Sequence, residues 1–157
     1  MAAKLLKMKE RNNCIEEMKK EMKEKLKQER SSNRKRYLDT LKNLILQGMI
    51  KLLEPSLQIC CREDDVKDIK GMTSGIEKEF SKFMKDKTGR DEYECKLSVM
   101  GDRFIKPEQD EDCGGIILYT DDHRIVCPNM LISRLGLAFE ECLPMIRTTL
   151  FPDNVKV

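Results

Sequence analysis

The sequence predicts an α+β fold in which a long N-terminal helix precedes a small head with a mixed β-sheet packed by helices. Three observations support this. Residues 1–36 hold 13 Lys and Arg against 6 Asp and Glu, whereas residues 37–157 hold 17 against 22. The second stretch carries most of the apolar periodicity. It alternates helical and strand-like segments in the order β-α-β-β-β-α, which builds a sheet covered by helices. We therefore expect an N-terminal helix within residues 1–53 and a head over residues 54–157.

The first helix is predicted over residues 4–30, which lack Pro and Gly and are rich in strong helix formers. A polar helix buries too little surface to be stable alone, so we expect residues 1–36 to need a partner for order. An interruption or a new N-cap is expected near residues 31–33, Ser-Ser-Asn. One narrow apolar stripe flanked by charge is typical of one side of a two-chain helical pair. This stripe, the seam, consists of Ile15, Met18, Met22 and Leu26.

The next elements follow from periodicity and from residues that end helices. Residues 37–52 continue the helical pattern, and Pro55 ends it because its ring excludes the helical conformation for the preceding residue. Residues 57–62 predict a short strand. Asp64-Asp65 predicts the N-cap of a helix that ends at Gly89. The expected apolar face of that helix is Ile69, Met72 or Thr73, Ile76, Phe80 and Phe83.

The second half of the head predicts strands and a final helix. Residues 93–100 alternate as a strand does, and residues 106–112 predict a solvated acidic loop. Residues 114–127 predict a hairpin around a four-residue turn. Asn129 predicts the N-cap of the last helix, which Pro144 should kink or divide. Its expected inner stripe is Leu131, Leu135, Ala138, Cys142 and Ile146.

The sequence predicts no catalytic, metal or cofactor site. The seven Cys include no CxxC pair, and the single histidine, His123, falls in the predicted hairpin turn. The acidic run 108–112 lacks the ligand spacing of a calcium loop. Gly114-Gly115 is followed by no GK[ST], so a strand entry or bulge is favoured over a phosphate site. With no run of ~20 apolar residues and no signal-peptide core, we expect a cytoplasmic protein.

The basic stretch 1–36 leaves two functional classes open. Clustered Lys and Arg would suit a basic-helix nucleic-acid or adaptor binding module. However, acidic residues are interleaved throughout this stretch, and no aromatic residue precedes Tyr37. These features favour a helix pair with a solvated charged face, and therefore no nucleic acid as partner.

Four blocks between residues 38 and 152 resemble a known family. They are residues 46–55, the strand that ends at Cys61-Arg62, the strand from Gly114-Gly115 to Tyr119, and residues 129–151. Their order and spacing resemble the E subunit of the vacuolar-type (V-type) proton ATPases, a component of the peripheral stalk. The head-motif residues that carry the resemblance are Gln47, Gly48, Glu54, Pro55, Arg62, Gly114, Gly115, Ser133, Arg134, Leu135 and Arg147.

The resemblance implies a structural stator subunit without catalysis of its own. The N-terminal stalk helix would pair with a G-type subunit as a heterodimer, and the head would anchor the catalytic-head subunits A and B. The collar subunits C and H are further candidate contacts. The chain would then lie on the cytosolic face of vacuolar or other acidifying membranes, associated with them only through the complex. Arg134 and Arg147 become candidates for packing the last helix or docking a neighbour.

Overall fold

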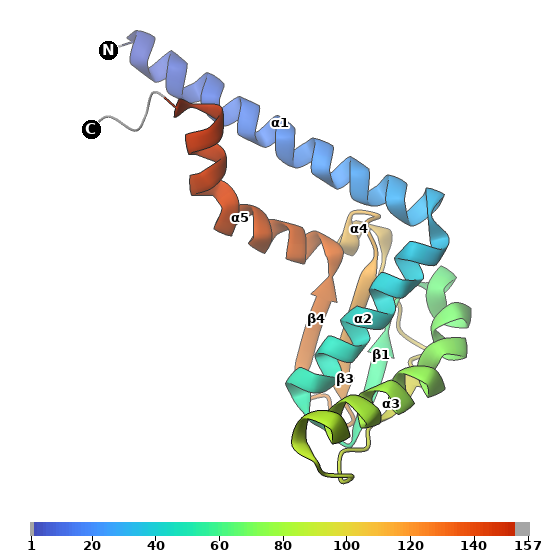
Figure 1. Ribbon diagram of the computed structural model, residues 1–157. Coiled ribbons are helices and arrows are strands. Elements are labelled where there is room, and N and C mark those ends of the chain that lie inside the picture. Colours follow the sequence, from blue (N-terminus) through green and yellow to red (C-terminus); the bar gives the residue numbers. More distant parts are fainter. Residues whose placement is uncertain (1, 153–157) are drawn as a thin grey trace.

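A computed structural model describes residues 2–152 of the chain and confirms the α+β prediction (Figure 1). Residue 1 and residues 153–157, the outer ends of the two predicted segments, lie outside the described residues. The division of the chain at residue 53 stays a prediction. The elements are α1 (Ala2–Ser32), α2 (Arg34–Leu52), β1 (Ser56–Cys60), a 3-10 turn (Glu63–Asp65), α3 (Val66–Thr88), β2 (Lys96–Val99), α4 (Pro107–Asp110), β3 (Gly115–Thr120), β4 (Val126–Met130) and α5 (Leu131–Leu150).

The interruption predicted near residues 31–33 lies at Asn33, where the chain changes direction between α1 and α2 (Figure 1). The Asn33 side chain accepts a hydrogen bond from the Arg36 N–H at 3.3 Å, so it caps the new helix. At its other end, α2 stops before Pro55, with Leu53 in the left-handed conformation at φ 53°. Both helix ends therefore follow from local sequence.

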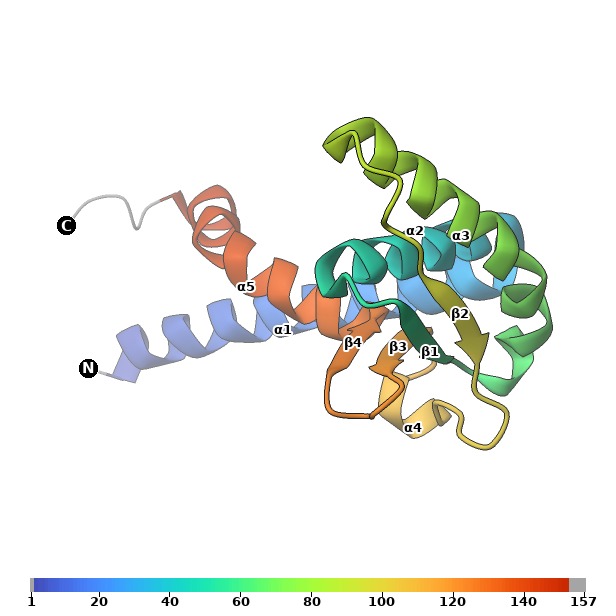
Figure 2. The same cartoon turned by 90° about the horizontal axis from the view of Figure 1, so that it is seen from below.

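The four strands form one mixed sheet in the order β2-β1-β3-β4. β1 and β2 run parallel, whereas β1–β3 and β3–β4 are antiparallel. α3 makes the crossover that a parallel pair requires, and α2 and α3 lie together over one face of the sheet (Figure 2). The predicted hairpin is present as β3–β4, but its turn spans residues 121–125 rather than four residues, and β4 begins at Val126 and runs to Met130.

The core lies between α2, α3 and the sheet. Gly48 is needed there, because a Cβ at this position would overlap the Leu118 side chain of β3. Aliphatic and aromatic side chains from all three elements form one cluster, whose fully buried members include Leu41, Ile45, Met49, Leu57, Ile59, Ile69, Ile116 and Leu118. Since interiors are close-packed, this cluster fixes how α2 sits on the sheet.

Two predictions for α3 are wrong. Phe83 is 38% exposed, and Met84 is buried in its place. Asp65 occupies the N-cap position but makes no capping bond. Its buried carboxylate instead accepts a hydrogen bond from the Tyr37 hydroxyl at 2.8 Å and lies 2.7 Å from the Arg34 guanidinium. Tertiary partners on α2 therefore outcompete the local cap. The predicted end at Gly89 is confirmed, with φ 70°.

The start and inner stripe of α5 also differ from the prediction. Asn129 does not cap the helix: its side chain donates to the Leu44 carbonyl at 3.1 Å and accepts from Arg134. Pro144 lies inside one continuous helix, which bends but is not divided (Figure 1). Phe139 is the buried residue of α5, whereas the predicted stripe members Leu131, Leu135 and Ile146 are half-buried and Ala138 and Cys142 are exposed.

Candidate partner-binding site

The seam lies on the side of α1 that faces α5 and α2. Ile15 is only 5% exposed, while Met18, Met22 and Leu26 are half-buried. Leu26 lines a small hollow together with Tyr37 and Leu131. In both views α1 and α5 leave the sheet on the same side (Figures 1 and 2). Within this chain, the stripe that the sequence assigns to a partner helix is therefore partly covered.

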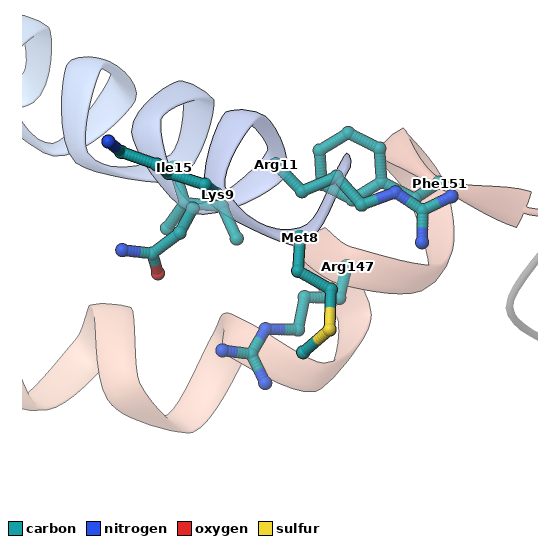
Figure 3. Close-up of a pocket in the computed structure, with 7 residues that line it drawn as sticks. Met8, Lys9, Arg11, Ile15, Arg147 and Phe151 are labelled. Carbon is teal, nitrogen blue, oxygen red and sulfur yellow. The ribbon is translucent and has the colours of Figure 1, made fainter. Parts of the chain in front are cut away.

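An open pocket of about 440 Å³ lies between the N-terminal half of α1 and the C-terminal end of α5 (Figure 3). Met8, Arg11 and Ile15 line it from α1, and Arg147 and Phe151 line it from the other side. The Arg11 guanidinium lies 5.0 Å from the centroid of the Phe151 ring. Further along, the Lys19 ammonium lies 5.8 Å from the centroid of the Phe139 ring. Cation–aromatic contacts therefore join the two helices around a pocket that they do not fill.

Ion pairs connect the second half of α1 to the acidic segment before β3 and to the 3-10 turn. The Lys23 ammonium lies 2.8 Å from a Glu111 carboxylate oxygen. Arg30 lies 3.4 Å from Asp64 and donates to the Asp112 carbonyl at 3.3 Å. Pairs at this exposure are worth about 0–1 kcal/mol each, so they orient α1 rather than lock it.

Arg62 and the acidic segment form a buried network that the solvated-loop prediction missed. Residues 107–110 form the short helix α4, and Asp110 is fully buried. Arg62 is 7% exposed and donates to both Asp110 oxygens, at 2.9 and 3.2 Å, and to Asp112 at 3.1 Å. Asp110 also accepts from the Gly114 N–H at 3.2 Å. Two features of the sequence point to this buried pair: a lone Arg at the end of a strand, and an acidic run that holds its partner 48 residues later.

Gly114 and Gly115 form the entry to β3, as predicted for this pair. Both have positive φ, 87° and 130°, in the region that favours glycine. A Cβ on Gly114 would overlap the Tyr37 ring, and one on Gly115 would lie 2.5 Å from the Met130 Cα. These glycines therefore allow the Tyr37 ring and the backbone at Met130 to approach the start of β3 closely.

Arg134 joins α5 to α2. Its guanidinium donates to the Gln47 side chain and to the Asn129 side chain, both at 2.9 Å. Asn129 in turn binds the carbonyl of Leu44 on α2. This chain of contacts anchors the beginning of α5, which is one of the two roles expected for Arg134.

The other head-motif residues lie apart from these networks. Glu54 and Pro55 line a shallow hollow with residues of the β3–β4 turn. Ser133 is exposed, Leu135 is half-buried, and Arg147 lies at the α1–α5 pocket. The structure thus brings Arg62, Gly114 and Tyr37 together, and separately Gln47 and Arg134. It does not gather the motif into one site, and whether these residues touch a partner stays a prediction.

Burial controls the titrating groups of the core. Burial and the neighbouring Asp65 carboxylate raise the pKa of the Tyr37 hydroxyl. Burial also raises the pKa of Cys61 to about 12 and that of Cys95 to about 11, so both stay thiols at neutral pH. Over residues 2–152, no group of three or more His, Cys, Asp or Glu side chains is placed to bind a metal ion. Within the same range, no helix is long and apolar enough to cross a membrane.

The sequence matches one family model along nearly its whole length. Residues 1–151 match the ATP synthase (E/31 kDa) subunit family. The chain belongs to this family. The resemblance to the E subunit of the V-type proton ATPases, which rested on four blocks after residue 38, is therefore confirmed and extends through α1.

Members of the family from distant organisms align with most of this chain. The E subunit of the V-type proton ATPase of Dictyostelium discoideum is 34% identical over 92% of this chain and 61% of its own length. That of Drosophila melanogaster is 31% identical over 80% of this chain and 51% of its own. The E 2 subunit of Mus musculus is 30% identical over 97% of this chain and 62% of its own length. The chain thus spans between half and two thirds of the length of these relatives.

Proposed function

We propose that the chain is a non-catalytic stator subunit in the peripheral stalk of a V-type proton ATPase. The observation that carries this proposal is the family match over residues 1–151, which includes the polar helix α1 as well as the sheet. α1 has 31 residues, about 46 Å at 1.5 Å per residue, and extends beyond the sheet (Figure 1). A long helix attached to a packed α+β unit suits a part that bears force between two bodies.

The proposed mechanism is mechanical. A rotating central shaft exerts torque on the catalytic headpiece, and the peripheral stalk keeps that headpiece from turning with it. α1 would gain bending stiffness by pairing along the seam with a G-type subunit, while residues 54–157 would attach to the catalytic-head subunits A and B. Subunits C and H are candidate contacts at the other end. The chain would reach the cytosolic face of an acidifying membrane through the complex.

The seam provides the test of this proposal. Met18→Asp with Met22→Asp places two carboxylates in the paired face, where desolvation without a partner weakens pairing. We expect binding of the G-type subunit to fall at least about tenfold, equivalent to about 1.4 kcal/mol. The matched control, Asn13→Asp with Gln28→Asp, adds the same charge at exposed positions of α1 and should bind normally.

The same variants are then assayed for ATP hydrolysis and proton uptake in a reconstituted complex. The seam variant should fail to assemble or should uncouple the two activities, and the control should behave as the unchanged chain. His123→Ala should have no effect, because His123 lies in the β3–β4 turn. Normal assembly and pumping by the seam variant would contradict the proposal. Salt-dependent binding to RNA instead would favour the nucleic-acid alternative.

A further inference from the structure

The burial of Ile15 is the starting observation. Most side chains on α1 are exposed, yet Ile15 is 5% exposed and lies at the pocket with Arg147 and Phe151 (Figure 3). Phe139, the buried residue of α5, receives Lys19 of α1 over its ring. The apolar stripe expected to hold a partner helix is therefore in contact with α5 of the same chain.

We propose that α5 is a displaceable cover of the seam, so that α5 and a partner helix compete for one surface on α1. This inference rests on the proposed function, because it takes the seam as the partner-binding surface. The partner that fits is an amphipathic helix with a narrow apolar stripe and acidic flanks. Three features of the α1–α5 contact support the competition.

The first feature is the looseness of the contact. The pocket of about 440 Å³ between the helices is open, whereas well-packed helix pairs leave few voids larger than a water molecule. On α5, Leu135, Leu143 and Ile146 remain half-buried. Since α5 packs loosely against α1, few well-packed contacts are lost when α5 leaves this surface.

The second feature is charge. α1 carries ten Lys and Arg against six Asp and Glu, a net charge of +4, whereas α5 carries two of each. α5 meets Lys19 with an aromatic ring rather than a carboxylate. A partner helix with acidic flanks would complement the net positive charge of α1, whereas α5 carries no net charge.

The third feature is reach. Met8 lies one heptad before Ile15, on the same face of α1, and is 63% exposed. Leu5 and Leu6, nearer the free end, are 71% and 61% exposed. The apolar surface of α1 thus continues beyond the part that α5 covers. A partner helix that ran along all of α1 would bury surface that α5 leaves in solvent.

Hydrogen–deuterium exchange of the full chain, with and without a recombinant G-type subunit, tests this directly. If the two occupants compete, binding should increase protection of α1 and decrease protection of residues 135–150 in α5. Unchanged or increased protection of α5 would overturn the inference, because α5 would then lie beside the partner instead of giving way to it. Absence of binding altogether would contradict the proposed function, which separates the two failures.

A variant pair gives an independent measurement. Phe139→Ala weakens the cover and leaves the sequence of α1 unchanged. Phe139 also lies outside the main apolar cluster. Because α1 would be uncovered in a larger fraction of the molecules, the G-type subunit should bind at least about threefold more tightly. Leu137→Ala, on the same helix but 64% exposed, is the control and should leave the affinity unchanged. Equal or weaker binding by Phe139→Ala would mean that α5 does not compete.

Discussion

Replacing Asp110 by Asn should destabilise the fold more than any other single loss of charge in the acidic segment. Asp110 is fully buried, and its two oxygens accept from Arg62 at 2.9 and 3.2 Å. Arg62 is itself only 7% exposed, so the substitution leaves a guanidinium without its main counter-charge. Removing one partner of a buried pair costs about 3–5 kcal/mol.

The lower part of that range applies here. An Asn oxygen can still accept from the Gly114 N–H, and Asp112, 3.1 Å from Arg62, still offers a half-exposed carboxylate. We therefore expect a loss of about 3 kcal/mol, a large part of the about 5–15 kcal/mol by which a small domain is stable. With a urea dependence of about 1.5 kcal/mol per M, the unfolding midpoint should fall by about 2 M. Circular dichroism measures it.

Two controls distinguish the buried pair from a general charge effect. Asp112→Asn removes the same charge from a side chain that is 56% exposed, and it should cost at most about 1 kcal/mol. Arg62→Met combined with Asp110→Asn removes both charges, so it should lose clearly less than the sum of the single variants. Equal midpoint shifts for Asp110→Asn and Asp112→Asn, or strict additivity in the double variant, would refute the reasoning.

Three further predictions concern the core and α5. Gly48→Ala should lower the free energy of unfolding by about 1–3 kcal/mol, because the added methyl overlaps Leu118, and a urea titration would show no loss if this were wrong. Stability should fall above pH 9. Cys61 and Cys95 hold their protons to pKa values of about 12 and 11, while the unfolded thiols ionise near 9, so the unfolded state loses protons first. The loss is about 1.4 kcal/mol per pH unit per thiol, and urea midpoints at pH 8 and pH 10 should show a smaller drop in Cys61→Ala. Leu135→Ala should cost about 1–2 kcal/mol, since Leu135 is half-buried, and an unchanged midpoint would contradict its packing.

Local patterns predicted most of the fold because the determining signals are close together in sequence. Asn33 and Gly89 end or begin helices through bonds within four residues. The β3–β4 hairpin likewise depends on a short turn between alternating segments. For such elements, backbone preference and tertiary structure agree, so a single sequence is sufficient.

The misassigned polar residues share one cause, which is a partner far away in sequence. Asp65 and Asn129 have the side chains of helix caps, but they bond to Tyr37 and to the Leu44 carbonyl on α2 instead. Asp110 looks like part of a solvated acidic run until Arg62 is placed beside it. A capping preference of about 1 kcal/mol is too small to prevail over buried hydrogen bonds that only the folded chain provides.

The inner face of α5 was mispredicted for a different reason. Its apolar residues point in several directions, so a stripe through Ala138 and Cys142 fits the sequence as well as one through Phe139. A helix that is apolar on most sides is typical of a buried helix, yet Leu137 and Met145 are 64% and 70% exposed. These two side chains are mostly exposed in the chain, whereas Phe139 is only 7% exposed. Measurements that compare Phe139→Ala with Leu137→Ala therefore separate the face of α5 that holds the chain together from the face that does not.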